Sequence, residues 1–553
     1  MKKLKVLLSF IISCFIFITL FSCKSNIIDN SEINILFTTD VHCGVSDNIG
    51  YSALSQYKNE LLNNSKKVTL VDCGDAIQGD YIGAVSKGEY IIEIMNSLGY
   101  EMMTLGNHEF DYGMDILSQR ISEFNGDVLS CNINYVGKNS NKLSSVKPYK
   151  IIDYGNTKVG YLGVTTPFTI TDSTPANFME DNEIVYTLGD LTKPEEFYQL
   201  IQSNVDELKN SGCSYVVVLG HLGYGSEYKE FSSDEVIKNT KGIDVFLDGH
   251  AHKEIPCDYY KNKEDKYIPL CSLEYKLKEF GRVTISSDGL IQVGVISNYS
   301  NKDSNCDNLL ENINTKLEEL GNRVLATSNM ELSTTDSDGI RITRNQETAI
   351  GNFVADAYRY AGNATIGFAN GGGIRDKIKS GDLTFKDMMS VNPFGNTICT
   401  MEATGSQIAD YLEFASKSTE LDYKSGGKPI GESGAFACVS GLKYTIDTSI
   451  ESSVLIDEKG FFNGVSGKRR VKDILVLEGD TYNPIDLEKK YLVSSINYIL
   501  TNGGDGASMF MGNEVKTKDI MLDYEAIVNY IVDVLEGDLL SKYGTLEGRI
   551  TKI

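Results

Sequence analysis

The chain has 553 residues, of which 41% are hydrophobic and 23% are charged. This balance is typical of a folded protein and excludes a fibrous or disordered chain, and the length predicts two large domains. The net charge is −24 at pH 7. Because an acidic protein repels phosphate-rich polymers at long range, no nucleic-acid polymer is expected as a partner.

The N-terminus has the layout of a secretory signal peptide. Three lysines within the first five residues precede an apolar run from Val6 to Phe21, as in a signal sequence. The stretch from Leu20 to Cys23 resembles the lipobox of bacterial lipoproteins, whose cysteine is acylated. We therefore expect a lipoprotein signal peptide at 1–23 and a tether at 24–32. The protein would be exported and held in the cell envelope or on the outer side of the cytoplasmic membrane, touching the membrane only through this lipid anchor. A plain cleaved signal and an uncleaved anchor helix are the alternatives.

Apolar runs along the first part of the chain indicate an α/β fold. Each run is short enough to be a strand, and the sequence between runs is long enough for a helical crossover. In sheets of this kind, chemically active side chains collect in the loops at strand ends. The runs are 33–37, 68–71, 102–105, 159–164, 215–219 and 245–247.

A change of pattern near residue 300 predicts a domain boundary. The stretch 299–307 is polar, and leucine and isoleucine recur at helical spacing over 308–324. A second region with helix and strand patterns and two glycine-rich loops follows. We predict a first domain at 33–300, a linker and bridging helix at 301–330, and a second domain at 331–553.

All 5 histidines of the chain lie at or just after these strand-like runs. A single histidine on an apolar run is usually a core residue, but five of them in strand-end loops argue against that reading. Together with nearby carboxylates and an amide, they suit divalent ions such as Zn²⁺, Mn²⁺, Co²⁺ or Fe²⁺ better than Ca²⁺. The predicted metal ligands are Asp40, His42, Asp75, Asn107, His221, His250 and His252.

These ligands divide between two ions. Asp40 and His42, two residues apart in an expected extended loop, can point at one ion, and Asp75 can bridge both ions through its two oxygens. His252 completes the shell of one ion. The shell of the other is completed by Asn107, His221 and His250. Two cations about 3.5 to 4 Å apart activate a water and stabilise an in-line phosphoryl displacement, so the predicted reaction is hydrolysis of a phosphate ester.

The remaining histidine, His108, has a different predicted role. Asp111 lies three residues further on, so its carboxylate can orient the ring and favour the protonated form. A charged imidazole beside the phosphoryl group stabilises its oxygens or protonates the leaving alkoxide. The alternative is that His108 is a further metal ligand.

The order of these motifs resembles the calcineurin-like metallophosphoesterase superfamily. The motifs are D-x-H, G-D-x-x-Q-G at 74–79, G-N-H-E, G-H and G-H-x-H. Within the superfamily, the stretch from Gly106 to Asp111 and the presence of a second domain resemble the 5′-nucleotidase family. The resemblance implies an α/β protein with an N-terminal catalytic β-sandwich flanked by helices (αββα), a bridging helix, and a C-terminal α/β domain that binds the nucleotide.

The second domain carries segments that resemble the nucleotide-binding motifs of this family. They are Arg344-Asn345-Gln346-Glu347, Asn370 to Arg375, Pro393 to Asn396, and Gly503 to Gly506. The resemblance implies that Arg344, Asn370 and Arg375 hold the substrate, and a guanidinium fork suits phosphate or carboxylate groups. It also implies that Phe394 stacks on the base and that Asp505 binds the ribose hydroxyls.

The base site departs from the family pattern at one position. The second stacking aromatic of the family lies six residues before the aspartate, where this chain has Ile499, and Tyr498 lies one position earlier. Either the loop shifts so that Tyr498 stacks, or only Phe394 does. In addition, Asn396 is placed to hydrogen-bond the base edge.

We therefore expect an exported enzyme that releases phosphate from nucleoside 5′-monophosphates with two divalent ions, Zn²⁺, Mn²⁺ or Co²⁺. The alternatives within enzymes are 2′,3′-cyclic nucleotides, 3′-nucleotides, UDP-sugars and nucleoside di- or triphosphates as substrates. A non-catalytic surface binding protein is a further alternative, but it predicts the loss of a ligand, and every ligand is present. The native metal and the oligomeric state stay open.

Overall fold

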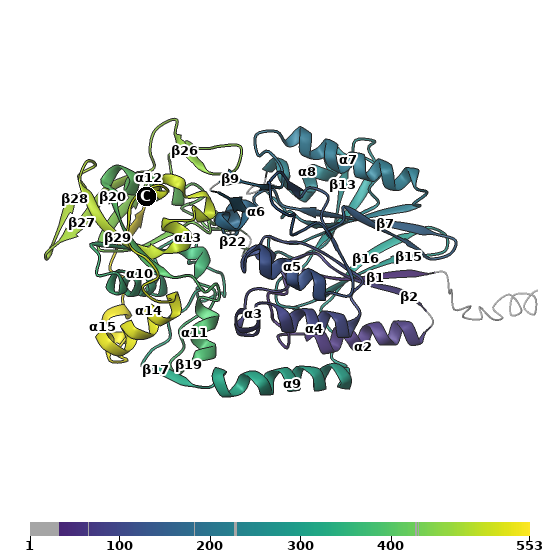
Figure 1. The fold of residues 1–553 in the computed structure, drawn as a ribbon, viewed down its shortest axis with the longest axis horizontal. Helices are drawn as coiled ribbons and strands as arrows, with labels where there is room; N and C mark the ends of the chain where they lie inside the picture. Colours follow the sequence, from purple (N-terminus) through teal and green to yellow (C-terminus); the bar gives the residue numbers. More distant parts are fainter. Residues whose placement is uncertain (1–31, 65, 182, 226–228, 426–427, 430) are drawn as a thin grey trace, which may run out of the picture.

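The computed structural model describes residues 32–64, 66–181, 183–225, 229–425, 428–429 and 431–553. The predicted signal peptide at 1–23 lies outside the described residues, as does all but the last residue of the predicted tether. Two domains lie side by side, and helix α9 (Ser304–Gly321) runs along one side of the first (Figure 1). In the part of the chain that the structure describes, no helix combines the length and apolar character needed to cross a membrane.

The first domain is built on two six-stranded sheets. In the first sheet, β1 to β4 are parallel and β15 and β16 continue antiparallel beyond β1. Its order is β16 (Ile291–Ile296), β15 (Phe280–Ile285), β1 (Ile33–Thr38), β2 (Lys67–Asp72), β3 (Met102–Thr104) and β4 (Asp127–Leu129). In the second sheet, β7, β11, β12 and β14 are parallel, with an antiparallel strand at each edge. Its order is β13 (Ile255–Lys261), β14 (Tyr267–Ser272), β12 (Val245–Asp248), β11 (Tyr215–His221), β7 (Lys158–Thr165) and β6 (Tyr149–Asp153).

The two sheets pack face to face. Ile35 and Phe37 of β1 lie in one buried cluster with Val217 of β11 and Leu247 of β12, whereas Leu36, which points to the opposite face of β1, packs among helices. Helices cover both outer faces. On the first sheet these are α2 (Gly50–Asn63), α4 (Glu89–Leu98), α5 (Met114–Glu123) and α9, and on the second they are α7 (Pro194–Asn210) and α8 (Ser233–Asn239). The expected αββα sandwich is confirmed.

The second domain contains a mixed five-stranded sheet. Its order is β23 (Ala437–Ser440), β18 (Ile366–Asn370), β29 (Lys490–Ile496), β20 (Ile398–Thr404) and β30 (Val515–Thr517). Only β18 and β29 pair in parallel. A four-stranded sheet adjoins it, formed by β28 (Thr481–Pro484), β27 (Val471–Glu478), β24 (Leu442–Ile446) and β31 (Ile550–Lys552). Helices α10 (Ala349–Ala361) and α12 (Gly405–Ala415) share the buried core of this domain with both sheets.

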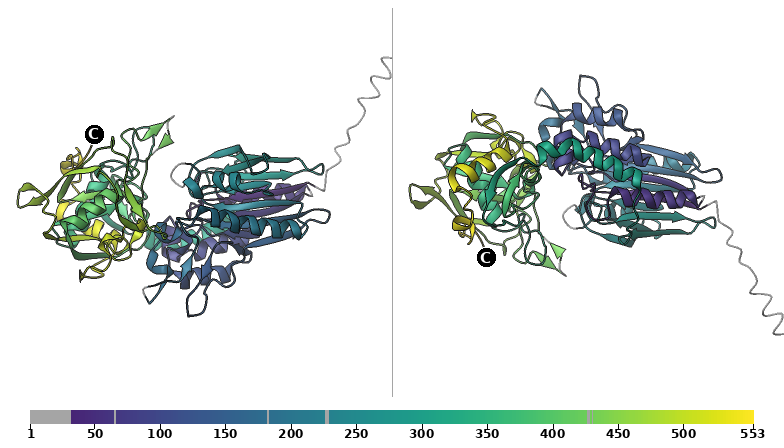
Figure 2. Two further views of the ribbon diagram at one scale, coloured as in Figure 1. Left: turned by 90° about the horizontal axis from the view of Figure 1, so that it is seen from above. Right: turned by 90° about the horizontal axis from the view of Figure 1, so that it is seen from below.

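Helix α9 joins the domains. The helical spacing predicted a helix over 308–324, and α9 starts four residues earlier because Asp303 caps it, accepting a hydrogen bond from the Asn305 N–H. Buried side chains of α9, including Ile313, pack against the first domain. The chain then enters β17 (Val324–Ser328), which pairs with β19 (Gly381–Thr384) in the second domain. Views from above and below show α9 lying along the first domain (Figure 2), and its end also contacts α11 (Phe385–Val391) of the second domain.

Candidate active site

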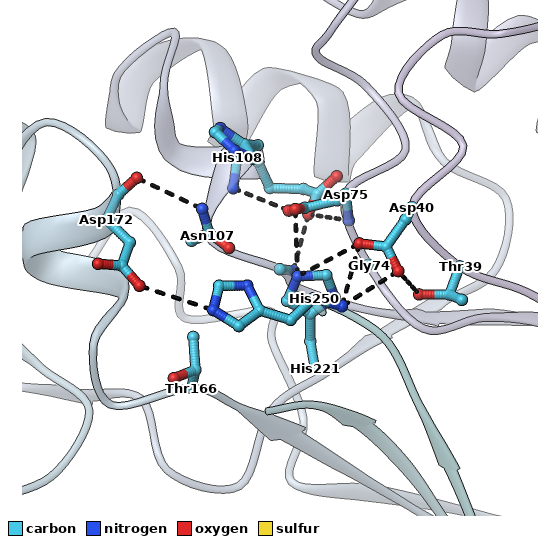
Figure 3. Close-up of polar contacts among 12 residues, drawn as sticks. Thr39, Asp40, Gly74, Asp75, Asn107, His108, Thr166, Asp172, His221 and His250 are labelled. Atoms are coloured by element: carbon cyan, nitrogen blue, oxygen red, sulfur yellow. Dashed lines mark hydrogen bonds and ion pairs between the residues drawn. The ribbon is translucent and has the colours of Figure 1, made fainter. Parts of the chain in front are cut away.

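The predicted ligands gather where the parallel strands of the two sheets end. The loops after β1, β2 and β3 supply Asp40 and His42, then Asp75, then Asn107 and His108. In the second sheet His221 is the last residue of β11, and His250 and His252 follow β12. Figure 3 shows several of these side chains converging from the two sheets. We call the seven predicted ligands, without His108, the metal cluster.

Five members of the metal cluster have left-handed backbone geometry. Their φ values run from 45° to 79°, a region that few residues other than glycine adopt and that persists only where the surroundings impose it. The residues are Asp40, His42, Asp75, His250 and His252. The expectation of an extended loop at Asp40 and His42 is therefore wrong, because the loop turns tightly, with the Gly44 N–H donating to the Val41 carbonyl at 2.8 Å. The turns direct the side chains into one cluster.

Glycines in the motifs allow these loops to approach closely. A Cβ on Gly249 would lie 1.9 Å from the Thr39 hydroxyl oxygen, and one on Gly106 would lie 2.2 Å from an Asp75 carboxylate oxygen. No side chain fits at such distances. The glycines of G-N-H-E and G-H-x-H are therefore required by packing against neighbouring loops.

The metal cluster divides into two ligand groups that share one carboxylate. Within each group, the candidate ligand atoms lie within 4.8 Å of one another. The first group is Asp40, His42, Asp75 and His252, and the second is Asp75, His221 and His250. Asp75 belongs to both, as a bridging ligand must. Its Oδ2 lies 3.1 Å from Nε2 of His221 and 3.7 Å from Nε2 of His42.

Asn107 is placed to join the second group. Its Nδ2 donates to the main-chain carbonyl of Asp172 at 3.3 Å. Its Oδ1 is buried and accepts no hydrogen bond from the residues that the structure describes. A buried oxygen of this kind is a suitable ligand atom for a divalent ion.

Main-chain carbonyls orient two of the histidine rings. Nδ1 of His42 donates to the Gln78 carbonyl at 2.9 Å, and Nδ1 of His221 donates to the Cys73 carbonyl at 2.7 Å. A ring that donates through Nδ1 keeps its Nε2 lone pair free for a metal. In both cases Nε2 faces Asp75. The donor set and its orientation therefore fit a pair of divalent ions.

The electrostatics of the cluster also fit cations. Burial alone lowers the pKa of His221, but the carboxylates of Asp75 and Asp40 raise it to about 10. Burial alone raises the pKa of Asp40, but the neighbouring His252 and His221 lower it to about 2. Burial holds the pKa of His42 well below its usual range. The buried carboxylates thus attract positive charge, which a divalent ion supplies more effectively than a proton.

Glu109 is a site residue that sequence reasoning missed. It is fully buried, and its two carboxylate oxygens accept main-chain N–H bonds from the loops after β2 and β3. The donors are Asp75, Ala76, Ile77 and Gly106, at 2.8, 2.8, 3.3 and 2.7 Å. Burial and the nearby Asp75 raise the pKa of Glu109 to about 7, although these N–H bonds act in the opposite direction. Glu109 ties together the loops that carry Asp75 and Asn107, and its place in G-N-H-E was the available signal.

His108 lies beside the metal cluster but belongs to neither ligand group. Its Nδ1 lies 2.6 Å from Asp111 Oδ2, and its main-chain N–H donates to Asp75 Oδ1 at 2.9 Å. Ser173 fixes Asp111 through a hydrogen bond of 2.7 Å. Burial alone lowers the pKa of His108, but the carboxylates of Asp111 and Asp75 raise it. This arrangement favours a protonated imidazole.

The second domain brings an aromatic ring and a guanidinium group to this position. The ring of Phe394 lies 5.9 Å from the ring of His108, and the Arg375 guanidinium lies 5.5 Å from the Phe394 ring centre. Burial and the charges of Arg344 and Arg341 lower the pKa of Arg375 to about 9. These arginines are therefore close enough to repel one another, and a bound anion would relieve that repulsion.

An ion pair between Arg341 and Glu432, near Arg344 and Arg375, was not found from the sequence. Arg341 pairs with Glu432 through Nε at 3.2 Å and Nη2 at 2.5 Å. Burial raises the pKa of Glu432, but Arg341 and Arg344 together bring it below its usual value. The two partners lie 91 residues apart, so no local pattern could have linked them.

The predicted ribose and base residues occupy neighbouring loops. Asn370 donates to Asp505 at 3.1 Å. The Tyr498 hydroxyl accepts from the Asp505 N–H at 3.0 Å and donates across the domain boundary to the Thr171 carbonyl at 3.2 Å. The six residues Arg344, Asn370, Arg375, Phe394, Tyr498 and Asp505 are called the C-terminal cluster.

The remaining positions near the base site are placed differently. Ile499, at the family's second aromatic position, is buried in the core. Asn396 is half-buried, and its main-chain carbonyl accepts from the Asp523 N–H at 2.9 Å. The stacking role of Tyr498 and the base contact of Asn396 stay predictions.

Fold and site together define a metallophosphoesterase, and comparison with known families agrees. Residues 33–254 match the model of the calcineurin-like phosphoesterases, and residues 324–512 match the model of the 5′-nucleotidase C-terminal domain. The chain therefore belongs to the 5′-nucleotidase family of calcineurin-like metallophosphoesterases. Enzymes of the calcineurin-like type use two divalent metals, and the metal cluster offers one ligand group for each.

Individual relatives cover nearly the whole chain. The trifunctional nucleotide phosphoesterase protein of Bacillus subtilis is 26% identical over 94% of this chain, which spans only 35% of that relative. A snake venom 5′-nucleotidase of Gloydius brevicauda is 27% identical, with 93% of this chain and 90% of the relative covered. Among solved structures, a 5′-nucleotidase precursor from Thermus thermophilus has the same fold, with a TM-score of 0.76 at 24% identity, covering 94% of this chain and 99% of that one.

Proposed function

We propose that the protein is an exported enzyme that removes phosphate from nucleoside 5′-monophosphates with two divalent ions. One observation carries the proposal: Phe394 of the second domain lies against His108, which adjoins the metal cluster, and the Arg375 guanidinium lies against the Phe394 ring. A base-stacking ring and an anion-binding group at this position suit a substrate that joins an aromatic base to a phosphate. The venom 5′-nucleotidase among the relatives supports both the substrate class and export.

In this proposal the metal cluster holds both ions. Asp40, His42, Asp75 and His252 would hold one ion. The other would be held by Asp75, His221 and His250, with the buried Oδ1 of Asn107. Metal ions held there would supply an activated water and neutralise charge on the phosphoryl oxygens. Zn²⁺, Mn²⁺ and Co²⁺ suit this mixture of imidazole, carboxylate and amide ligands.

His108 is proposed to act on the leaving group. Its Nε2–H faces away from the Asp111 contact, which holds the Nδ1 side of the ring. A protonated His108 can donate a hydrogen bond to a phosphoryl oxygen or a proton to the departing ribose oxygen. Asp111 keeps the charge on the ring and fixes its orientation.

The C-terminal cluster is proposed to bind the nucleotide. Arg344 and Arg375 provide guanidinium donors for the phosphate, and Phe394 stacks on the base. The ribose hydroxyls bind Asp505, which Asn370 orients through its side-chain amide. Asn396 contacts the base edge, and Tyr498 borders the base through its ring.

The proposal retains the predicted organisation of the chain. It comprises a lipoprotein signal peptide at 1–23, a tether at 24–32, a catalytic domain at 33–300, a linker with the bridging helix at 301–330, and a nucleotide-binding domain at 331–553. The protein would stay anchored in the cell envelope through acylated Cys23. The expected partner is the small-molecule nucleotide.

A second candidate function is a broader nucleotide phosphoesterase. The Bacillus subtilis relative is named a trifunctional nucleotide phosphoesterase, which favours more than one nucleotide substrate, and 2′,3′-cyclic nucleotides and 3′-nucleotides are the additional substrates that we consider. UDP-sugars and nucleoside di- or triphosphates belong to the same set of alternatives. A binding protein without activity is less favoured, since the metal cluster is complete.

Phosphate release by the chain from Ser25 onward tests the proposal. The assay compares AMP, ATP, UDP-glucose, 3′-AMP, 2′,3′-cyclic AMP and bis-p-nitrophenyl phosphate, each with Mn²⁺, Zn²⁺ or Co²⁺. We expect AMP to be the best substrate. A cyclic or sugar nucleotide as the best substrate would favour the second candidate, and no release from any substrate with metals bound would favour a binding protein.

A further inference from the structure

Helix α6 (Thr169–Asp172) lies between the metal cluster and the second domain, and its last residue contacts two members of the cluster. The main-chain carbonyl of Asp172 accepts from Asn107 Nδ2 at 3.3 Å. The carboxylate of the same residue places Oδ2 3.6 Å from Nε2 of His250. Figure 3 shows Asp172 beside both side chains, on the side opposite Asp40.

Both contacts orient proposed ligands of the same ion. Asn107 donates through Nδ2 to the Asp172 carbonyl, so its other amide atom, Oδ1, points away from Asp172. This Oδ1 is buried. A His250 ring with Nε2 beside a carboxylate keeps Nδ1 as the atom for the metal. A carboxylate beside the second nitrogen of a ligating histidine fixes the tautomer and makes the ring a stronger ligand.

The other ligand group has supports of its own. The ring of His42 is oriented by Gln78, and the Lys276 N–H donates to the Asp40 carbonyl at 2.9 Å. The His252 ring stacks on Tyr275, with ring centres 5.2 Å apart. These supports come from other loops, so a change at Asp172 leaves them in place.

We propose that Asp172 is a positioning residue for one of the two metal ions, the ion held by Asp75, Asn107, His221 and His250. The inference rests on the two-metal function proposed above. Its carboxylate is 31% exposed and lies 3.6 Å from Nε2 of His250, so a substitution there leaves the buried core unchanged. Removing such a carboxylate weakens metal binding by about 10- to 100-fold.

The same helix contacts the second domain. The Thr171 carbonyl, one residue before Asp172, accepts the hydrogen bond of Tyr498 at 3.2 Å. Helix α6 thus links the C-terminal cluster to one metal ion. Asp172 therefore lies next to a residue that contacts the C-terminal cluster and itself contacts two proposed metal ligands.

The test is calorimetric titration of the metal-stripped protein with Mn²⁺ and with Co²⁺, comparing wild type with Asp172→Ala and Asp172→Asn. We expect two ions on the wild type, and one of them bound about 10- to 100-fold more weakly by Asp172→Ala. Asp172→Asn should recover most of the affinity, because its amide oxygen accepts a hydrogen bond from the same ring nitrogen. The visible spectrum of bound Co²⁺ should change for the weakened ion only.

Asp190→Ala is the matched control, because its carboxylate is 27% exposed and pairs with Lys193 rather than with the metal cluster. Two ions with unchanged affinity in Asp172→Ala would overturn the inference and leave the proposed function intact. Equal weakening of both ions would also overturn it, as would lost activity with metal binding unchanged. Failure of the wild type to bind any ion would overturn the proposed function together with the inference.

Discussion

The metal cluster and the C-terminal cluster differ in how their side chains are held. In the metal cluster, main-chain carbonyls orient His42 and His221, and the loops themselves are tied together by a fully buried glutamate. In the C-terminal cluster, Arg375 and Phe394 are half-buried and lie against each other, and Phe394 contacts His108 of the first domain. The side chains of the metal cluster are held by contacts within the first domain. The C-terminal cluster depends on how the two domains meet, so it is better suited to select substrates than to perform the chemistry.

The largest effect is expected from Asp75→Ala, which removes the carboxylate shared by both ligand groups. Because metal ions contribute several kcal/mol to phosphoryl transfer, kcat should fall by roughly 10³-fold or more. Metal analysis of the purified variant should find fewer than two bound ions. Asp115→Ala, whose carboxylate is 83% exposed and lies on helix α5, is the control. Two bound ions with normal kcat in Asp75→Ala would contradict the shared role.

His108→Ala should reduce kcat by about 10²- to 10⁴-fold, the usual contribution of a positioned acid. Both ions should stay bound, because His108 lies in neither ligand group. Loss of an ion in this variant would instead make His108 a ligand.

The pH profile separates the acid role of His108 from a structural one. Asp111 raises the pKa of His108, so the protonated, active form is present below that pKa and is lost as pH rises through it. In Asp111→Asn the pKa falls, and the alkaline limb of kcat should move to lower pH. An unchanged limb would exclude His108 as the titrating acid.

Phe394→Ala tests the other half of the comparison. Loss of one stacking surface costs about 1 to 3 kcal/mol, which corresponds to an increase of about 5- to 150-fold in KM for AMP. The kcat value should change little, because the ring is proposed to hold the base, and its contact with the first domain is made to His108 and not to a proposed metal ligand. Hydrolysis of p-nitrophenyl phosphate, which lacks a nucleobase, should be unaffected. Equal loss with both substrates would assign Phe394 to packing.

The smallest effect is expected from Tyr498→Phe, which keeps the ring and removes the hydroxyl between Thr171 and Asp505. Each such hydrogen bond contributes about 0.5 to 1.5 kcal/mol, and neither is made to the substrate. We therefore expect the equivalent of no more than one bond to appear in binding, so that KM for AMP rises by roughly 2- to 10-fold. Tyr498→Ala, which also removes the ring, distinguishes the two contributions. If both variants have the same KM, the ring does not border the base.

The sequence predicted the metal cluster more completely than the contacts around it. All of the histidines lie at or just after apolar runs, and a short apolar run such as 33–37 is a local signal of a buried strand. The backbone geometry at Asp40 and His42 was missed because left-handed turns are favoured by glycine, and these positions carry none. The αββα arrangement came from the family resemblance, since the pattern of runs does not determine which strands share a sheet.

Contacts between distant loops explain the other omissions. Glu109 acts by accepting N–H bonds from a loop 32 to 34 residues earlier in the chain. Asp172 reaches Asn107 across 65 residues, and Arg341 reaches Glu432 across 91. No spacing rule connects such pairs, because their proximity is produced by the assembled sheets rather than by local chain geometry.

The crossing from α9 into β17 also bears on how such enzymes diversify. In the part of the chain that the structure describes, the backbone passes from one domain to the other at this point, and each core is formed almost entirely by the sequence on one side of it, with Met389 and Phe461 of the second domain packing into the core of the first. Recombination at this junction would join a different second domain, with its own C-terminal cluster, to an unchanged first domain with its metal cluster. Lineages could thus acquire new substrates by exchanging one continuous segment while the hydrolytic machinery is inherited intact.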